Sequence, residues 1–263
     1  MIDLHGVSLD IGGRPLLQGL DARFEPGELV AILGRNGAGK TTLLRAIAGL
    51  HAPVRGSIRI DGADVGRLKA MQRARRVAFV TSDDVLLDAL RVRDVVAIGR
   101  FPHHRWWQWQ ERDEDDVAID RALAAVGING FARRLFSTLS SGERQRVWIA
   151  LGLAQATPVL LLDEPTSHLD LRVAHEILGL LRTLATEGKT VLCVLHDLND
   201  AAAYADRLVL LGDRRLLCAD APDAVLASDL PERAYGVAME RVRLQDGRLR
   251  VFGFKNPPES RCP

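Results

Sequence analysis

Lysine, cysteine and long hydrophobic segments are scarce in this sequence. Only four of the 35 basic residues are lysines, and the three cysteines are widely spaced and odd in number. This cysteine pattern does not suit a disulfide framework and predicts a reducing compartment. No uncharged apolar run reaches about eighteen residues, the length needed to cross a bilayer. Any membrane association is therefore expected through a partner or a surface contact.

Charge of one sign is also lacking. The 35 basic and 34 acidic residues leave a formal net charge of +1. Such a balance argues against a strongly basic nucleic-acid surface, so no nucleic-acid partner is expected. What the chain does have is 263 residues with 47% hydrophobic content, which is enough for a well-buried core.

The most informative segment runs from Gly34 to Thr42 and fits the P-loop pattern G-x-x-x-x-G-K-[ST]. A short apolar run at 29–33 precedes it and a segment with helical spacing at 42–49 follows it, which predicts strand, loop and helix in that order. The residues expected to bind a nucleoside triphosphate are Gly34, Arg35, Asn36, Gly37, Ala38, Gly39, Lys40, Thr41 and Thr42. The alternative interpretation is a glycine-rich turn before an ordinary helix.

Two side chains of this loop have distinct expected roles. Lys40 would reach the terminal phosphates as a point charge, while the Thr41 hydroxyl would bind a magnesium ion that bridges them. The loop glycines would turn backbone amides inward, and the helix that begins near Lys40 would add its positive end. ATP and Mg²⁺ are therefore the expected cofactors.

Acidic residues follow a second apolar run at the sheet edge where an open α/β fold binds its ligand. Asp163 and Glu164 come directly after 159–162. Beside a P-loop, Asp163 is expected on the metal side and Glu164 as the general base that polarises water. The alternative is an acidic turn before Pro165.

His196 ends a further apolar strand. A lone histidine there is compatible with a purely structural role. Placed parallel to Glu164, it would donate a hydrogen bond to a terminal phosphate as charge develops.

The segment Ser140, Ser141, Gly142 and Glu143 allows two interpretations. Ser140 and Glu143 form a capping-box pattern that opens an amphipathic helix. A glycine in the first turn beside capping serines also leaves amides that can receive an anion.

Strand and helix patterns alternate along most of the chain. Short strands are predicted at 29–33, 77–80, 159–162, 191–195 and 208–211. Helices are predicted at 93–99, 113–126, 141–155, 171–186 and 198–204. The expected fold is α/β, a P-loop NTPase core with a mainly parallel sheet and an N-terminal antiparallel β part.

We expect one domain over 1–263 with three parts. Its core would comprise 1–82 and 159–220, and an inserted helical subdomain would comprise about 83–158. A small C-terminal appendage would follow at 221–263, with a hairpin around Asp246-Gly247.

Taken together and in this order, these elements resemble the ATP-binding subunits of ABC transporters, over about 1–220. The resemblance implies that Gly34–Thr42 is Walker A, that 159–163 is Walker B followed by the catalytic Glu164, and that His196 is the switch histidine. It also implies that Asp170 ends the D-loop and that 139–143 is the signature sequence. In the family the signature closes over ATP bound by the opposite subunit. The implied assembly is a head-to-tail dimer that sandwiches two nucleotides and drives a membrane partner.

Three positions depart from the family pattern. The signature has Ser141-Gly142 in place of two glycines. Ile11 stands where an aromatic residue commonly stacks on adenine, which predicts weaker base contact. Ser82 stands where the family has a glutamine, and we hypothesise that Ser82 or Asp83 supplies a water-mediated substitute.

A second, shorter resemblance concerns the transported molecule. The segment 95–103 is similar to one found in importer ATPases for iron chelates, haem and cobalamin, which pair with separate permeases and a binding protein outside the membrane. Nearby, Trp106, Trp107 and Trp109 lie in a polar stretch and are interpreted either as a permease docking surface or as a locally packed loop.

The expected function is therefore an ATPase that powers a bacterial importer, with an iron-siderophore or related iron chelate as the leading substrate and haem or cobalamin as the alternative. It would lie at the cytoplasmic face of the inner membrane, bound peripherally. Two other classes stay open: a soluble non-transport ABC ATPase and a noncatalytic nucleotide-binding subunit.

Overall fold

A six-stranded sheet forms the centre of the molecule, for which the computed structural model describes residues 1–81, 87–104 and 113–254. Its strand order is β10-β9-β3-β8-β7-β6, parallel throughout except for the edge strand β10. The bounds are β3 Leu29–Leu33, β6 Val77–Val80, β7 Val159–Leu162, β8 Thr190–Val194, β9 Arg207–Gly212 and β10 Arg215–Asp220.

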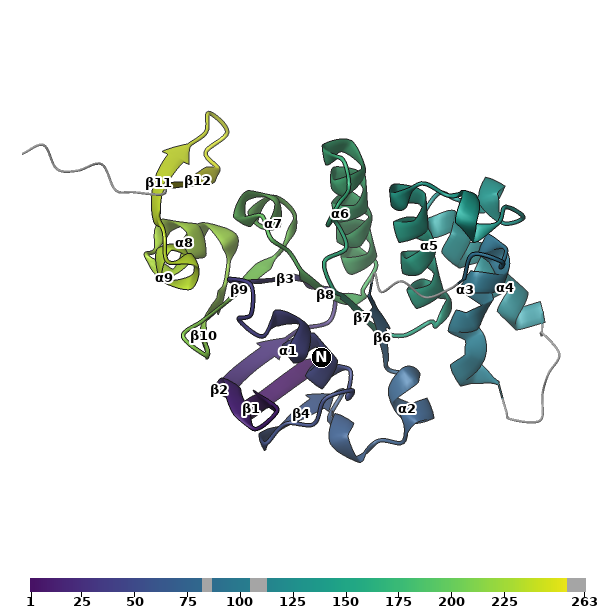
Figure 1. Cartoon of the computed structure of the whole chain (residues 1–263), viewed down its shortest axis with the longest axis horizontal. Helices are drawn as coiled ribbons and strands as arrows, with labels where there is room; N and C mark the ends of the chain where they lie inside the picture. The colour runs from purple at the N-terminus through teal and green to yellow at the C-terminus, as the bar shows by residue number, and fades with distance from the viewer. Residues whose placement is uncertain (82–86, 105–112, 255–263) are drawn as a thin grey trace, which may run out of the picture.

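A second, antiparallel sheet is built mainly from the N-terminal part of the chain. Its order is β2-β1-β4-β5. The bounds are β1 Ile2–Ile11, β2 Arg14–Phe24, β4 Arg55–Ile60 and β5 Ala63–Asp64. In Figure 1 this sheet and helix α1 (Lys40–Ile47) lie below the central sheet, while helices α6 (Leu171–Thr186) and α7 (Leu198–Tyr204) lie above it.

Alternate residues of the central strands enter two separate cores. In β7, Leu160 and Leu162 pack with the helices above, whereas Val159 and Leu161 pack with α1 and the antiparallel sheet. Both faces are covered, which explains why these strands read as continuous apolar runs rather than alternating ones.

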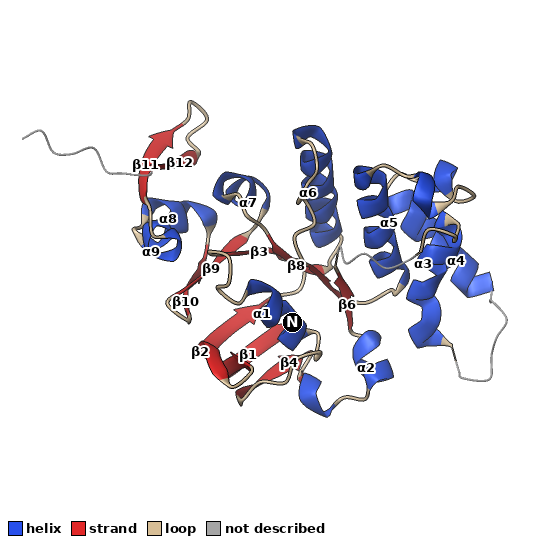
Figure 2. Cartoon of the chain, in the orientation of Figure 1, coloured by secondary structure: helices blue, strands red, loops and turns tan. Residues whose placement is uncertain are grey.

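The helices are unevenly distributed. The long ones are α4 Asp113–Ala125, α5 Ser141–Ala154 and α6 Leu171–Thr186, and the shorter ones are α1 Lys40–Ile47, α2 Ala70–Ala74, α3 Val92–Ala97, α7 Leu198–Tyr204, α8 Pro222–Ala227 and α9 Leu230–Tyr235. In Figure 2, three of them (α3, α4 and α5) lie together at the right of the view, away from the antiparallel sheet. Short 3₁₀ segments occur at Val65–Arg67, Ile98–His103, Asn129–Phe131 and Phe136–Thr138. None of the described helices combines the length and apolar content that crossing a membrane requires.

Helices α3, α4 and α5 form a block at one end of the central sheet (Figure 1). A buried ion pair ties it together, since Arg100 Nε donates to Asp115 Oδ1 at 2.8 Å. Arg100 Nη1 also donates to the carbonyl of Ala154 at the end of α5. Because both charges are buried and satisfied, loss of either partner would leave an unpaired charge in the interior.

At the other end, α8 and α9 precede a hairpin of β11 Ala238–Arg243 and β12 Leu249–Phe254. The side chain of Asn199 on α7 accepts from Val251 N at 2.9 Å and donates to Val251 O at 3.0 Å. This paired contact attaches the hairpin to the helix that follows His196.

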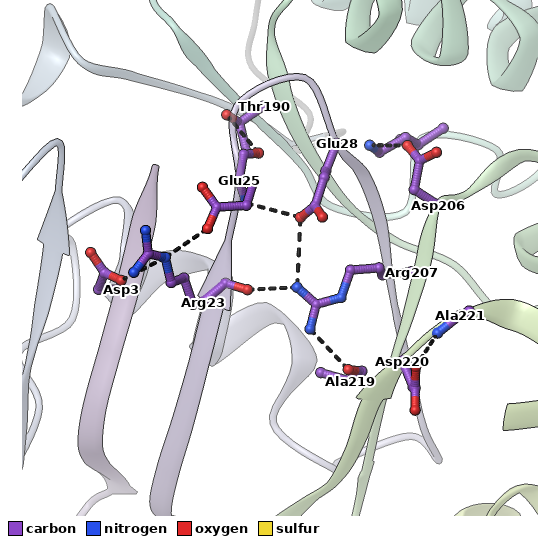
Figure 3. Close-up of polar contacts among 11 residues, drawn as sticks. Asp3, Arg23, Glu25, Glu28, Thr190, Asp206, Arg207, Ala219, Asp220 and Ala221 are labelled. Atoms are coloured by element: carbon purple, nitrogen blue, oxygen red, sulfur yellow. Dashed lines mark hydrogen bonds and ion pairs between the residues drawn. The ribbon is translucent and has the colours of Figure 1, made fainter. Parts of the chain in front are cut away.

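Arg207 joins the two sheets at the start of β9 (Figure 3). Its guanidinium donates to the carbonyls of Arg23 at 2.6 Å and Ala219 at 2.9 Å, and lies 3.6 Å from Glu28 Oε2. Next to it, Asp206 Oδ2 accepts from Leu29 N at 2.9 Å. These contacts fix the entry to β3, the strand that leads into the P-loop.

The predicted fold class is confirmed, including the mainly parallel sheet and the antiparallel N-terminal part. The predicted strands and long helices are confirmed to within a few residues, as is the C-terminal hairpin. The sequence did not predict α2, α8 and α9, because helices of five or six residues are too short to show a helical period. The antiparallel edge strand β10 was not predicted either. The division into core, helical subdomain and appendage stays a prediction.

Candidate functional site

The P-loop connects β3 to α1 and depends on glycine at defined positions. Gly34, Gly37 and Gly39 have φ values of 146°, 81° and 96°. A Cβ at Gly34 would lie 2.5 Å from the carbonyl oxygen of Leu211, and one at Gly39 would lie 3.0 Å from the side chain of Leu17. A side chain is therefore excluded at Gly34 by conformation and by space, while one at Gly39 would be strained by its positive φ and tight against Leu17.

Lys40 is buried beneath this loop, with 5% of its surface exposed. Its Nζ donates to the carbonyls of Gly34 at 2.8 Å and Arg35 at 3.2 Å, so the side chain folds back over the loop. Burial lowers the pKa of Lys40, and the carboxylates of Glu164 and Asp163 partly oppose that shift. A phosphate anion in the loop would add to the negative charge near the ammonium group and would favour its protonated form further.

Thr41 and Asp163 meet although 122 positions separate them in the sequence. The Thr41 hydroxyl donates to Asp163 Oδ1 at 3.0 Å. In the part of the chain that the structure describes, no group of three His, Cys, Asp or Glu side chains has metal-binding geometry. A hydroxyl and a carboxylate fit Mg²⁺, which prefers oxygen ligands and completes its shell with water and substrate phosphates.

Glu164 and His196 come from the ends of the neighbouring strands β7 and β8. His196 Nε2 lies 2.9 Å from Glu164 Oε1, and the Ser167 hydroxyl donates to Glu164 Oε2 at 3.1 Å. Glu164 has a left-handed φ of 53°, which is unusual for a residue with a side chain. Both carboxylate oxygens are thus held by side chains from different segments.

The pKa of Glu164 is lowered by these contacts. Burial works in the opposite direction, but the hydrogen bond and charge of His196, the hydroxyl of Ser167 and the charge of Lys40 outweigh it. A carboxylate in this setting is ionised at neutral pH, the form in which it accepts a proton.

Lys40, Thr41, Glu164 and His196 line one cleft of about 400 Å³, whereas Asp163 and Ser167 contact lining residues from outside the lining set. Its lining residues are Ile11, Leu16, Asn36, Gly37, Gly39, Lys40, Thr41, Thr42, Glu164 and His196. Ile11, at the end of β1, lines this cleft with 57% of its surface exposed.

The segment Ser140–Glu143 lies elsewhere, at the start of α5, and is not part of the cleft lining. Ser140 Oγ accepts from Glu143 N at 3.3 Å and Glu143 Oε2 accepts from Ser140 N at 2.8 Å, so the predicted capping box is confirmed. Gly142 packs against Val173 on α6, where an added Cβ would lie 2.7 Å from Val173 Cγ1. Asp170 caps that same helix by accepting from Val173 N.

Some predicted features cannot be placed. Ser82, Asp83 and the cluster of Trp106, Trp107 and Trp109 lie outside the described residues. The contact of Ser167 with Glu164 was not predicted from the sequence. Their spacing of three residues in a turn is the only sequence feature that could have pointed to it.

The site and the fold define a P-loop nucleotide-binding protein, and the comparison with known proteins narrows this class. The ABC transporter family matches residues 17–167, more than half of the chain. The chain belongs to the ABC transporter family.

Several relatives are import proteins by name. A hemin import ATP-binding protein of Gloeobacter violaceus is 43% identical over 90% of this chain and 88% of its own length. A Bacillus subtilis protein named for a siderophore transport system is 37% identical over 90% of this chain and 86% of its own length. A cobalamin import ATP-binding protein of Halobacterium salinarum is 42% identical over 89% of this chain, and this chain spans 58% of that relative's length.

Solved structures agree with this assignment. An ABC transporter of metal-chelate type, in an inward-facing conformation, superposes with a TM-score of 0.84 at 26% identity, covering 96% of this chain and 97% of that one. A dimeric ATP-binding cassette bound to ADP and Pi superposes with a TM-score of 0.73 at 29% identity, covering 84% of this chain and 99% of that one.

Replacing Ser167 by alanine is expected to move the acid limb of the kcat pH profile to higher pH. The variant loses a hydrogen bond that lowers the pKa of Glu164, so this carboxylate becomes protonated at a higher pH than in the wild type. Steady-state ATP hydrolysis between pH 4 and 8 measures the shift. Thr186→Ala, at the far end of α6, is the control, and an unchanged profile in Ser167→Ala would contradict the assignment.

Gly142→Ala is expected to lower the free energy of unfolding by about 1–3 kcal/mol, because the new methyl group overlaps Val173. Chemical denaturation measures this loss. The double variant Gly142→Ala, Val173→Ala removes the overlapping atoms and should recover most of the stability. If the single variant is as stable as wild type, the close packing of α5 on α6 has no energetic importance.

Proposed function

We propose that this chain is the ATP-hydrolysing subunit of a bacterial ABC importer and works as a head-to-tail pair with a second copy. The observation that carries the proposal is the convergence of Lys40, Thr41, Glu164 and His196 on one cleft, with Asp163 hydrogen-bonded to Thr41. These groups are the ones that phosphoryl transfer to water requires.

ATP binding is assigned to the loop and its first helical turn. The amides of 34–42 would surround the phosphates, and Lys40 would exchange its two carbonyl partners for phosphate oxygens. Thr41 and Asp163 would hold Mg²⁺, which when bound neutralises charge on the phosphates.

Hydrolysis is assigned to Glu164 and His196. Glu164 accepts the proton of the attacking water, and its lowered pKa keeps it ionised for that task. His196, held 2.9 Å from it, donates to the terminal phosphate as charge develops.

The second copy is assigned the remaining face of the nucleotide. Ser140, Ser141, Gly142 and Glu143 do not line this chain's own cleft, which fits a contribution to a partner's site. Asp170 in the D-loop lies between Glu164 and α6 in sequence and would lie at the same interface. A structural relative is a dimeric cassette, which supports this arrangement.

Substrate and membrane partners follow from the relatives. We assign an iron-siderophore or related iron chelate as the transported class, with haem or cobalamin as the second candidate because relatives carry those names. The chain would bind integral permease subunits at the cytoplasmic face of the inner membrane. A substrate-binding protein outside the membrane would contact the permease, and no nucleic acid is involved.

Uptake by cells that lack this chain tests the assignment. Cells that carry a candidate permease but lack this chain are complemented with the wild-type chain or with Glu164→Gln. They are then given labelled iron-siderophore, haem or cobalamin. We expect uptake of one of the three compounds in cells complemented with the wild-type chain, and no uptake in cells complemented with Glu164→Gln. Uptake that is independent of the chain for all three would overturn the importer assignment, even if purified protein hydrolyses ATP.

A further inference from the structure

A second cavity adjoins the P-loop and has no role in the mechanism above. Its volume is about 460 Å³, comparable to the 400 Å³ of the nucleotide cleft. The two cavities share Leu16, Asn36 and Gly37, so the loop forms a wall of both. The other walls come from the turn between β9 and β10 and from α9.

This cavity concentrates positive charge from three separate segments. Arg35 belongs to the P-loop, Arg214 to the β9–β10 turn and Arg233 to α9, and Asp213 is the one carboxylate in the lining. Three guanidinium groups against one carboxylate give the lining a formal charge of +2.

The three arginines have no hydrogen bond or ion pair from their side chains to any residue that the structure describes. Elsewhere in this arginine-rich chain such partners are common: Arg207 and Arg241, for example, each contact several oxygens. Three like charges with a single carboxylate, Asp213, in the same lining repel one another, and an anion between them would relieve that repulsion.

One backbone hydrogen bond and two close approaches at glycine residues bring the walls together. Gln18 N donates to Arg214 O at 2.9 Å, which fixes the β9–β10 turn to β2. A Cβ at Gly212 would lie 3.3 Å from Ala234 Cα, so the glycine allows α9 to approach β9 closely. Arg35 Nη1 in turn lies 3.4 Å from the Cβ position of Gly236, directly after α9.

We propose that this cavity is a second anion site, which binds a small phosphate-bearing ligand between Arg35, Arg214 and Arg233. Planar guanidinium groups match phosphate oxygens in a bidentate manner. Because Arg35 is part of the P-loop, the ligand and the nucleotide phosphates lie on two faces of one loop. Their negative charges oppose each other, so each ligand weakens binding of the other. The coupling rests on the proposed ATP site, whereas the anion site itself does not.

The test uses the full chain with Lys40→Ala, which weakens the nucleotide cleft, and measures pyrophosphate and AMP binding by isothermal titration calorimetry. We expect at least one of these two compounds to bind with a stoichiometry of one molecule per chain. Adding Arg214→Ala and Arg233→Ala should weaken this binding about tenfold or more. Because both arginines are exposed, we expect the melting temperature of this variant without ligand to equal that of Lys40→Ala. That measurement shows whether the variant folds.

The matched control replaces Arg59 and Arg121, two exposed arginines whose side chains also have no hydrogen bond or ion pair within the described part of the chain and which do not line this cavity. It removes the same charge and should leave the affinity within about twofold, as expected for distant and screened charges. The proposal is wrong if neither anion binds, if the Arg214, Arg233 pair has no effect, or if both pairs weaken binding equally. None of these outcomes depends on ATP hydrolysis, so the proposed function is tested separately.

Discussion

Replacing Glu164 by glutamine is expected to lower kcat for ATP hydrolysis by about 10²–10⁴-fold while ATP binding is retained. Glutamine has nearly the same shape and its oxygen still accepts hydrogen bonds, but it does not take a proton from water. The measurement is steady-state hydrolysis of purified protein with Mg²⁺, together with ATP binding by calorimetry.

The same variant should accumulate as an ATP-bound dimer, because hydrolysis would be the step that reopens the proposed pair. Size-exclusion chromatography with ATP detects this species. Glu187→Gln, at the exposed end of α6, is the matched control and should hydrolyse ATP at the wild-type rate. Hydrolysis by Glu164→Gln at the wild-type rate would show that another group acts as the base.

Lys40→Ala is expected to weaken ATP binding by about 10- to 100-fold, as for loss of a hydrogen-bonded charge on a phosphate. The unliganded protein should lose little stability, because burial already disfavours the Lys40 ammonium and lowers its pKa. Calorimetric titration with ATP and thermal unfolding without ligand measure the two quantities.

Lys69 provides the control for this variant, since it is an exposed lysine at the start of α2. Lys69→Ala should bind ATP as the wild type does. Equal affinities of Lys40→Ala and wild type would remove the P-loop lysine from the site. An unliganded protein that fails to fold would show that the bonds of Lys40 to the loop carbonyls stabilise the loop itself.

Much of the fold was predictable because its segments are locally distinctive. The apolar runs that became β3 and β7 are buried on both faces, and α6 has a regular apolar stripe of Ile177, Leu181 and Leu184. Strand β10, which pairs with β9 directly after a short turn, was missed because most of its side chains are only half-buried and give no clear apolar pattern. The short helices α8 and α9 are stabilised by packing against β9 and the hairpin, which no local pattern encodes.

The candidate site divides in the same way. Gly34, Gly39 and Lys40 form a contiguous motif whose geometry is fixed within one strand–loop–helix unit. The left-handed backbone of Glu164 and its bond from Ser167 depend on how the chain leaves β7, and the sequence analysis did not predict them.

By itself, the sequence determined the nucleotide-binding motif and the family, because both depend on residue types at short, fixed spacings. Only the tertiary structure decided which distant side chains meet. Strand β8 lies between β3 and β7. That order places the Thr41 hydroxyl within hydrogen-bond distance of Asp163 and places His196 beside Glu164. The same strand order and the position of α9 bring Arg35, Arg214 and Arg233 around one cavity. Periodicity along a chain specifies which face of a strand is buried, but it does not specify that strand's neighbours.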